Sequence, residues 1–178
     1  MAPDRRRLIL DAAISVIAQH GVRGLRVETV AAEAGVAVSL IYYYFGSRNG
    51  LVGATLDHAN ERAARVAEAG LRATLLAELD ESARGVSAVW GEIQASAVFQ
   101  PALQEKVREA TAAWVDLVAT AAAAEAPEID ARAAAERLTA LVDGLAARWL
   151  AGALELDRAR GLLQSAIDAE LSANAPTK

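Results

Sequence analysis

Three consecutive tyrosines and a nearby arginine are the side chains whose types and spacing most clearly suggest chemistry. Tyr42, Tyr43 and Tyr44 carry hydroxyls that can donate hydrogen bonds, and Arg48 carries a permanent positive charge. Such groups can bind phosphate oxygens. The alternative is ordinary core packing. Successive helical residues point about 100° apart, however, so three neighbours cannot all be buried against one surface. At least one ring must therefore be exposed.

The tyrosines belong to the second of two short predicted helices. Apolar residues at spacings of three and four predict the first helix over residues 27–34. Gly35 ends it, because glycine reaches the left-handed conformation that is common at helix ends. A second apolar stripe then follows at helical spacing: Val38, Ile41 and Phe45. Two helices joined by a short glycine turn form a helix-turn-helix, whose second helix enters the DNA major groove.

Several short motifs accompany this pattern over roughly the first third of the chain: Ile9-Leu10-Asp11-Ala12-Ala13, Gly21, Ala34-Gly35-Val36, Ile41-Tyr42-Tyr43-Tyr44-Phe45, Ser47-Arg48 and Leu51-Val52. Together they resemble the N-terminal DNA-binding domain of the tetracycline-repressor (TetR) family. The resemblance implies a homodimeric, all-helical transcription regulator. Most members are repressors, and their C-terminal domain binds a small molecule that releases the DNA.

The resemblance also implies which side chains contact DNA. Tyr42 and Tyr44 match phosphate-contacting positions, and Arg48 matches a lysine of the family and keeps its charge. Three residues match positions that face base edges: Val38, Ser39 and Tyr43. The Ser39 hydroxyl can donate or accept a hydrogen bond, and Val38 can touch a thymine methyl.

Three positions depart from the family pattern. Leu40 replaces a common threonine and lacks its hydroxyl, and Ala37 stands where a capping serine is frequent. Arg26 stands at the usual threonine cap of the first motif helix. Arg26 can compensate by reaching a phosphate itself, with Thr29 beside it, and we expect both to contact DNA.

Composition and charge favour a helical protein with one nucleic-acid-binding end. The chain is 54% hydrophobic with only 4% aromatic residues, and its many alanines and leucines predict helix throughout. The net charge is −5, but residues 1–50 carry six arginines against four acids. The remainder carries 12 basic and 19 acidic residues. Such asymmetry indicates nucleic-acid binding by the first segment.

Enzymatic and metal-binding functions are not expected. The chain has no cysteine, and neither of its two histidines lies in a metal or catalytic motif. No serine has a nucleophile elbow around it, and no glycine-rich phosphate loop is present. We therefore expect no cofactor. No signal peptide is recognisable, and the longest uncharged stretch, residues 34–47, is too short to cross a bilayer. The protein is expected to be cytoplasmic.

We expect two domains, with residues 1–47 binding DNA and residues 48–178 forming a helical effector-binding and dimerisation domain. The expected helices of the second part cover residues 48–67, 71–79, 82–98, 101–124, 130–151 and 158–173. Pro101 suits a first helical turn, and Asp157 is expected to cap the last helix. By the resemblance, dimers form through the last two helices, paired with their twofold mates as a four-helix bundle.

Four residues are candidates for binding the small molecule: Trp90, Gln94, Trp114 and Asp143. Trp90 and Gln94 lie one helical turn apart and combine an apolar wall with a hydrogen-bonding amide, which suits a mostly apolar pocket. The alternative for the aromatic residues is plain core packing. Asp143 is either a polar residue of the dimer interface or a group that recognises cationic ligands.

The predicted function is ligand-responsive regulation of transcription by a homodimer on a pseudo-palindromic operator in double-stranded DNA. A small-molecule effector of unknown identity releases the operator, and no membrane is involved. The alternative is a helical small-molecule-binding protein without specific DNA binding. A sequence-indifferent architectural DNA protein fits the overall acidity less well.

Overall fold

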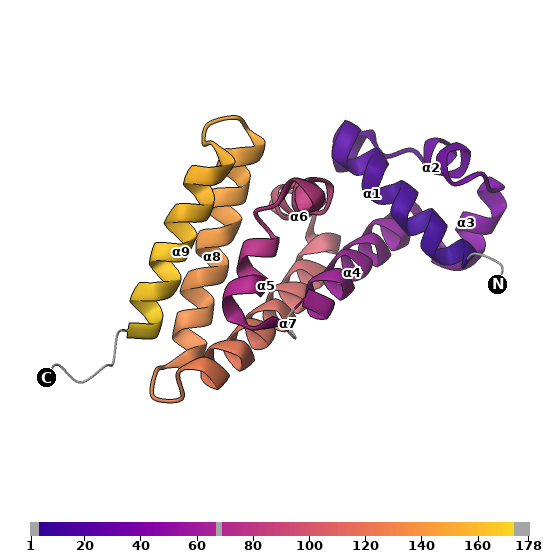
Figure 1. Ribbon diagram of the computed structural model, residues 1–178. Coiled ribbons are helices and arrows are strands. Elements are labelled where there is room, and N and C mark those ends of the chain that lie inside the picture. The colour runs from indigo at the N-terminus through magenta and orange to yellow at the C-terminus, as the bar shows by residue number, and fades with distance from the viewer. Residues whose placement is uncertain (1–3, 67–68, 173–178) are drawn as a thin grey trace, which may run out of the picture. The chain divides into compact units, whose positions relative to one another are not determined.

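The computed structural model describes residues 4–66 and 69–172, where the chain forms helices, turns and short connections without a strand. This confirms the predicted all-α fold (Figure 1). The α-helices are α1 (Arg5–Gly24), α2 (Val27–Ala34), α3 (Val38–Phe45), α4 (Arg48–Val66), α5 (Leu71–Ala77), α6 (Arg84–Ala97), α7 (Pro101–Glu125), α8 (Ala131–Leu150) and α9 (Leu156–Ser172). A short 3-10 helix, Glu81–Ala83, precedes α6.

The chain packs into two compact units. Unit 1 contains the chain up to Glu61 together with Gly85–Arg108, and unit 2 contains Arg62–Arg84 and the chain from Glu109 onward. Both α4 and α7 therefore contribute residues to each unit. This division by packing differs from the functional boundary expected after residue 47, which remains a prediction.

In unit 1, α2 packs on α1, and α3 packs on α2. The carboxylate of Asp4 caps α1 by accepting from the backbone N–H of Arg6 at 3.0 Å. The inner face of the helix is fully buried at Ile9, Ala13, Val16 and Ile17. The helical backbone breaks at Gly21 (φ 70°, ψ 169°), and one further turn follows.

In unit 2, α8 and α9 lie side by side and run in opposite directions (Figure 1). Asp130 caps α8 by accepting from the N–H of Ala133 at 3.0 Å. The two helices share one apolar core with α5 and α7, in which the largest side chains are Leu71, Leu75, Leu79, Leu138, Leu145, Trp149, Leu163 and Ile167. Asp157 is not the cap of α9, because the helix already begins at Leu156 and Asp157 lies in its first turn.

An ion pair joins the exposed edges of α8 and α9. Arg137 donates from Nε and Nη2 to the two carboxylate oxygens of Glu170, at 2.6 and 2.5 Å. The Glu170 side chain is only 17% exposed, whereas Arg137 is 58% exposed. These hydrogen bonds outweigh the effect of partial burial and lower the pKa of Glu170 below its ordinary value. The folded protein therefore favours the ionised carboxylate.

Because the pKa of Glu170 is lower in the folded state, the ion pair stabilises the fold fully at neutral pH. The contribution is lost as the pH falls from the unfolded-state pKa through the lower folded-state pKa. Urea unfolding across the acidic range should therefore show a smaller loss of unfolding free energy for Glu170→Gln than for the wild type. The control is Glu136→Gln, whose exposed partner Arg132 lies one turn away on the same helix. An equal pH dependence in Glu170→Gln and wild type would contradict the assignment.

Candidate DNA-binding surface

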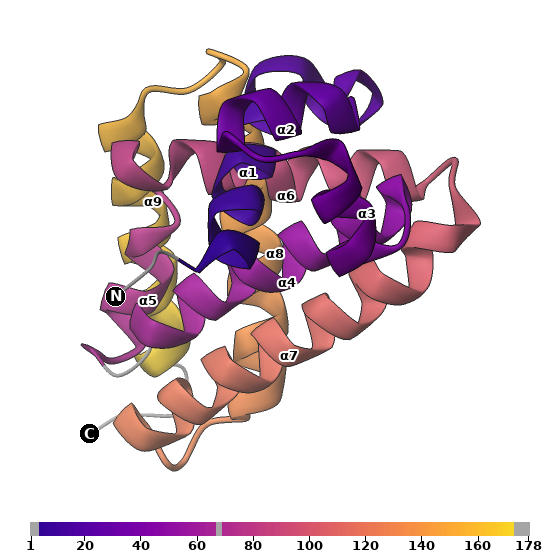
Figure 2. The ribbon, with the colours of Figure 1, turned by 90° about the vertical axis from the view of Figure 1, so that its right-hand side faces the viewer.

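The helices α2 and α3 form a helix-turn-helix with a well-defined turn (Figure 2). Gly35 adopts the left-handed conformation (φ 64°, ψ 38°), as the sequence predicted. The N–H of Val36 donates to the carbonyl of Ala31 at 3.0 Å, and that of Gly35 to Ala32 at 3.3 Å. This pair of bonds satisfies the last carbonyls of α2 and fixes the direction in which α3 leaves the turn.

The apolar stripes of the two helices are buried to different extents. On α2, Val27, Val30 and Ala31 are buried and Ala34 is half-buried. On α3 only Ile41 is fully buried, whereas Val38 and Phe45 are half-buried. The Phe45 ring lies beneath the guanidinium of Arg6, which is 5.6 Å from the ring centroid. Ile41 and the Arg6–Phe45 contact therefore both help to hold α3 in place.

All three tyrosines of α3 are exposed in this chain. The exposed fractions are 45% for Tyr42, 81% for Tyr43 and 40% for Tyr44. The rings of Tyr43 and Tyr44 meet edge to face, with centroids 5.4 Å apart. Core packing therefore does not account for these residues. They form an amphipathic surface with large apolar rings and hydroxyls that can donate to an acceptor.

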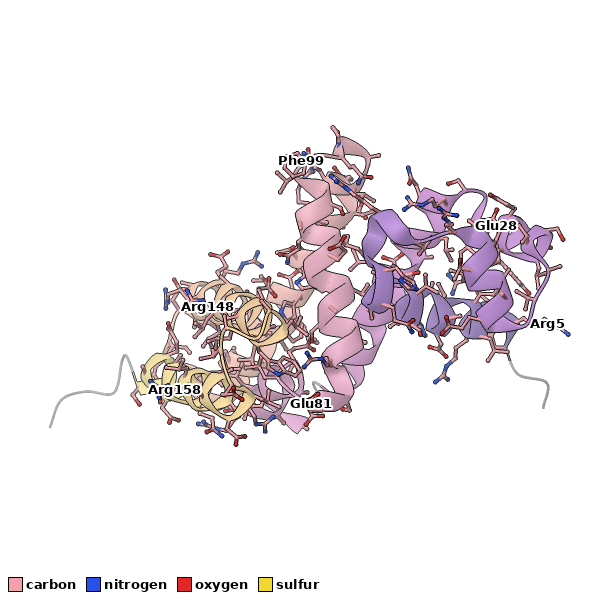
Figure 3. The ribbon with its side chains drawn as sticks, turned by 90° about the horizontal axis from the view of Figure 1, so that it is seen from above. Arg5, Glu28, Glu81, Phe99, Arg148 and Arg158 are labelled. Atoms are coloured by element: carbon pink, nitrogen blue, oxygen red, sulfur yellow. The ribbon has the colours of Figure 1, made fainter. Side chains whose placement is uncertain are left out.

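The other residues expected to contact DNA lie at the beginnings of α2 and α3. Arg26 and Thr29 are exposed, and Arg26 occupies the cap position of α2 without a side-chain capping bond. Ser39 is exposed, and Val38 is half-buried in the first turn of α3. Ala37 caps α3 without a side-chain bond, as its methyl group requires. Figure 3 shows this end of the chain, with Arg5 and Glu28 labelled.

Arg48 has partners that the sequence did not reveal. Its Nε donates to the carbonyl of Leu25 at 3.0 Å, and its Nη2 donates to the carbonyl of Val22. The side chain therefore ties the first turn of α4 to the connector between α1 and α2. A guanidinium carries five N–H donors, so these two bonds do not use all of them. The phosphate contact expected for Arg48 remains a prediction.

The candidate ligand-binding residues lie in both units. Trp90 and Gln94 are half-buried on α6 in unit 1, and Trp114 and Asp143 are half-buried on α7 and α8 in unit 2. Trp114 packs against the core of unit 2. These four assignments remain predictions.

Membrane insertion and metal binding find no structural counterpart in the described residues. No helix within 4–66 or 69–172 is sufficiently long and apolar to span a bilayer. In the same part of the chain, no cluster of three or more histidine or acidic side chains could hold a metal ion.

Comparison with known proteins places both parts of the chain. Residues 9–55 match the family model described as bacterial regulatory proteins, tetR family. Residues 67–172 match the model described as BetI-type transcriptional repressor, C-terminal. The HTH-type transcriptional regulator BetI of Cronobacter sakazakii is 32% identical, and the match covers 99% of this chain and 95% of that protein.

Solved structures agree with these matches. A chain from Rhodococcus sp., described as a TetR-family transcriptional regulator, is 39% identical with a TM-score of 0.87. The match covers 94% of this chain and 98% of that one. The multidrug binding protein EbrR, in complex with ethidium, is 31% identical with a TM-score of 0.67, covering 93% and 99% of the two chains. The relatives are regulators rather than enzymes, and the chain belongs to the TetR family of ligand-responsive, DNA-binding transcriptional regulators, with a C-terminal part of the BetI type.

Proposed function

We propose that the protein is a homodimeric repressor that binds a pseudo-palindromic operator and leaves it when a small molecule binds. The observation that carries this proposal is the exposure of Tyr42, Tyr43 and Tyr44 on α3, next to the buried Ile41 that holds the helix. In a homodimer, two copies of α3 would enter major-groove half-sites about 34 Å apart. A ligand releases DNA only to the extent that it binds the non-operator spacing of the two copies more tightly.

The proposed contacts are of two kinds: contacts to phosphates, which position the protein on DNA, and contacts to base edges, which give sequence specificity. Tyr42 and Tyr44 donate to phosphate oxygens, and Arg26, Thr29 and Arg48 contact the backbone beside them. Three residues of α3 face the base edges: Val38, Ser39 and Tyr43. The partial exposure of Tyr42 and Tyr44 and the nearly full exposure of Tyr43 support this division, because base edges lie deeper in the groove than phosphates.

The proposed effector is an organic cation. Ethidium, which EbrR binds, carries a permanent positive charge on an aromatic framework. In this chain, Trp90 and Trp114 offer aromatic faces for a cation–π contact, Gln94 offers an amide, and Asp143 offers a negative charge. Each of the four is proposed separately as a ligand-binding residue.

The proposed dimer interface is the outer face of α8 and α9. Gly144 is exposed on α8, and an added Cβ there would have no neighbour within 4 Å. At the half-buried Gly161 on α9, an added Cβ would likewise have no neighbour within 4 Å. Small residues on both helices allow a second helix pair to approach closely, as a four-helix bundle requires.

Operator binding tests the DNA contacts. The operator is first obtained by selecting bound fragments from the source genome. Tyr42→Phe removes one hydroxyl and should weaken operator binding about tenfold, because a hydrogen bond to a charged phosphate is lost. Arg26→Ala should lower the slope of log affinity against log salt by about 1. Arg108→Ala, which removes an exposed arginine of α7, is the control and should change neither quantity. Unchanged affinity and salt slope in both test variants would refute these contacts, and a wild type without any preferred sequence would favour the small-molecule carrier.

Light scattering tests the interface. Gly144→Arg should convert the dimer into a folded monomer, because a long charged side chain would enter the interface while the isolated chain has room for it. Gly91→Arg is the matched control, since an added Cβ at this exposed position of α6 also meets nothing within 4 Å. A Gly144→Arg variant that remains dimeric would place the interface elsewhere.

Titration with ethidium and choline tests the effector class. Trp90→Ala and Asp143→Asn should each weaken binding of both cations, by about tenfold if one cation–π contact or one charge interaction is lost. Asp168→Asn removes an exposed carboxylate of α9 and serves as the control. Failure of the wild type to bind either cation would exclude this class. If the cations bind but the variants match the control, the residue assignment is wrong.

A further inference from the structure

Side chains from two other helices hold both backbone groups of Val22. Its N–H donates to Oε1 of Glu92 on α6 at 3.1 Å, and its carbonyl accepts from Nη2 of Arg48 on α4. Val22 is itself buried. All of these residues belong to unit 1. Val22 is thus held at its N–H by a carboxylate 70 positions along the chain and at its carbonyl by a guanidinium 26 positions along the chain.

The approach of Glu92 depends on the glycine before Val22. Gly21 has φ 70° and ψ 169°, a backbone conformation that is essentially restricted to glycine. A Cβ at this position would lie 2.8 Å from Oε1 of Glu92. The carboxylate therefore occupies the space that a side chain would otherwise fill. The break in α1 and the contact with α6 are one structural feature.

The segment held in this way sets the start of the helix-turn-helix. Leu25 donates from its N–H to the carbonyl of Val22 at 3.3 Å, and its own carbonyl accepts from Nε of Arg48. Arg26 follows as the cap residue of α2. The connector is short and has several bonds, so the position of Val22 constrains the start of α2, which the Gly35 turn joins to α3.

The position of Glu92 on α6 relates the contact to the candidate ligand-binding residues of the same helix. Trp90 and Gln94 lie two residues before and after it, about 200° around the helix. The face of α6 that bears the proposed ligand-binding pair is thus opposite the face that bonds to Val22. Because α6 is one continuous helix, Arg84–Ala97, a ligand that shifts the whole helix through one face also shifts the other face.

We propose that Glu92 is a positioning residue that couples α6 to the recognition helix through the N–H of Val22. The inference rests on the proposed function, since it concerns how ligand binding reaches the DNA-binding helices. Operator binding requires two α3 helices in register, whereas non-specific binding needs only local contact with phosphates. Loss of the bond should therefore reduce the preference for operator over random DNA.

Three substitutions of Glu92 distinguish the effect of side-chain length from the effect of charge. Glu92→Gln keeps an oxygen acceptor at the same distance but removes the charge. Glu92→Asp keeps the charge but withdraws the oxygen by one carbon, and Glu92→Leu removes both. The ratio of operator to random-DNA affinity should be within about twofold of wild type for Gln and about tenfold lower for Asp and Leu. Glu105→Leu, an exposed carboxylate of α7 in the same unit, is the control and should keep the ratio.

Amide hydrogen exchange at Val22 tests the hydrogen bond to Glu92 in the absence of DNA. Exchange should remain slow in the wild type and Glu92→Gln and become faster in Glu92→Asp. If Glu92→Leu does not fold, the comparison of Gln with Asp still decides. Wild-type preference retained in Glu92→Asp, or equal losses in Gln and Asp, would overturn the proposal. A wild type that shows no operator preference would instead contradict the proposed function, whatever the exchange data show.

Discussion

The candidate DNA-binding surface depends on the positioning of α3, an eight-residue helix that is too short to be stable in isolation. Isolated helices shorter than about 12 residues are marginal in water, and α3 has only eight residues with one fully buried side chain, Ile41. Its position therefore comes from its surroundings: the left-handed Gly35 turn, the packing of Ile41 and the Arg6–Phe45 contact. This arrangement leaves the three tyrosines free to face a partner.

The same constraint explains why the connector before α2 has so many polar contacts. A short motif with little apolar surface of its own cannot be positioned by burial alone. Hydrogen bonds from Glu92 and Arg48 to the backbone of Val22 and Leu25 fix the position of the connector. Hydrogen bonds to charged groups are stronger than neutral ones and depend on direction, which suits positioning. They also make the placement of α2 sensitive to the helices that carry those side chains.

Unit 2 is built in a different way. Large aliphatic side chains fill the core between α5, α8 and α9, and the Arg137–Glu170 pair lies at its edge. Trp149 is buried there beneath the guanidinium of Arg84, 5.1 Å from the ring centroid, which accounts for it as a core residue. Burial supplies stability here, whereas directed polar contacts supply geometry around the helix-turn-helix.

The sequence by itself determined the all-α class, the helix-turn-helix, the Gly35 turn and the family, because these depend on residues close together in the chain. Periodicity did not foresee that Val38 and Phe45 would be only half-buried or that α9 would begin before Asp157, since neighbouring elements decide such details. Tertiary structure alone decided the partners of Arg48, Glu92 and Arg137. Their bonds join residues 23 to 70 positions apart. Local sequence patterns do not indicate which distant backbone group or side chain will lie beside a charged residue in the fold.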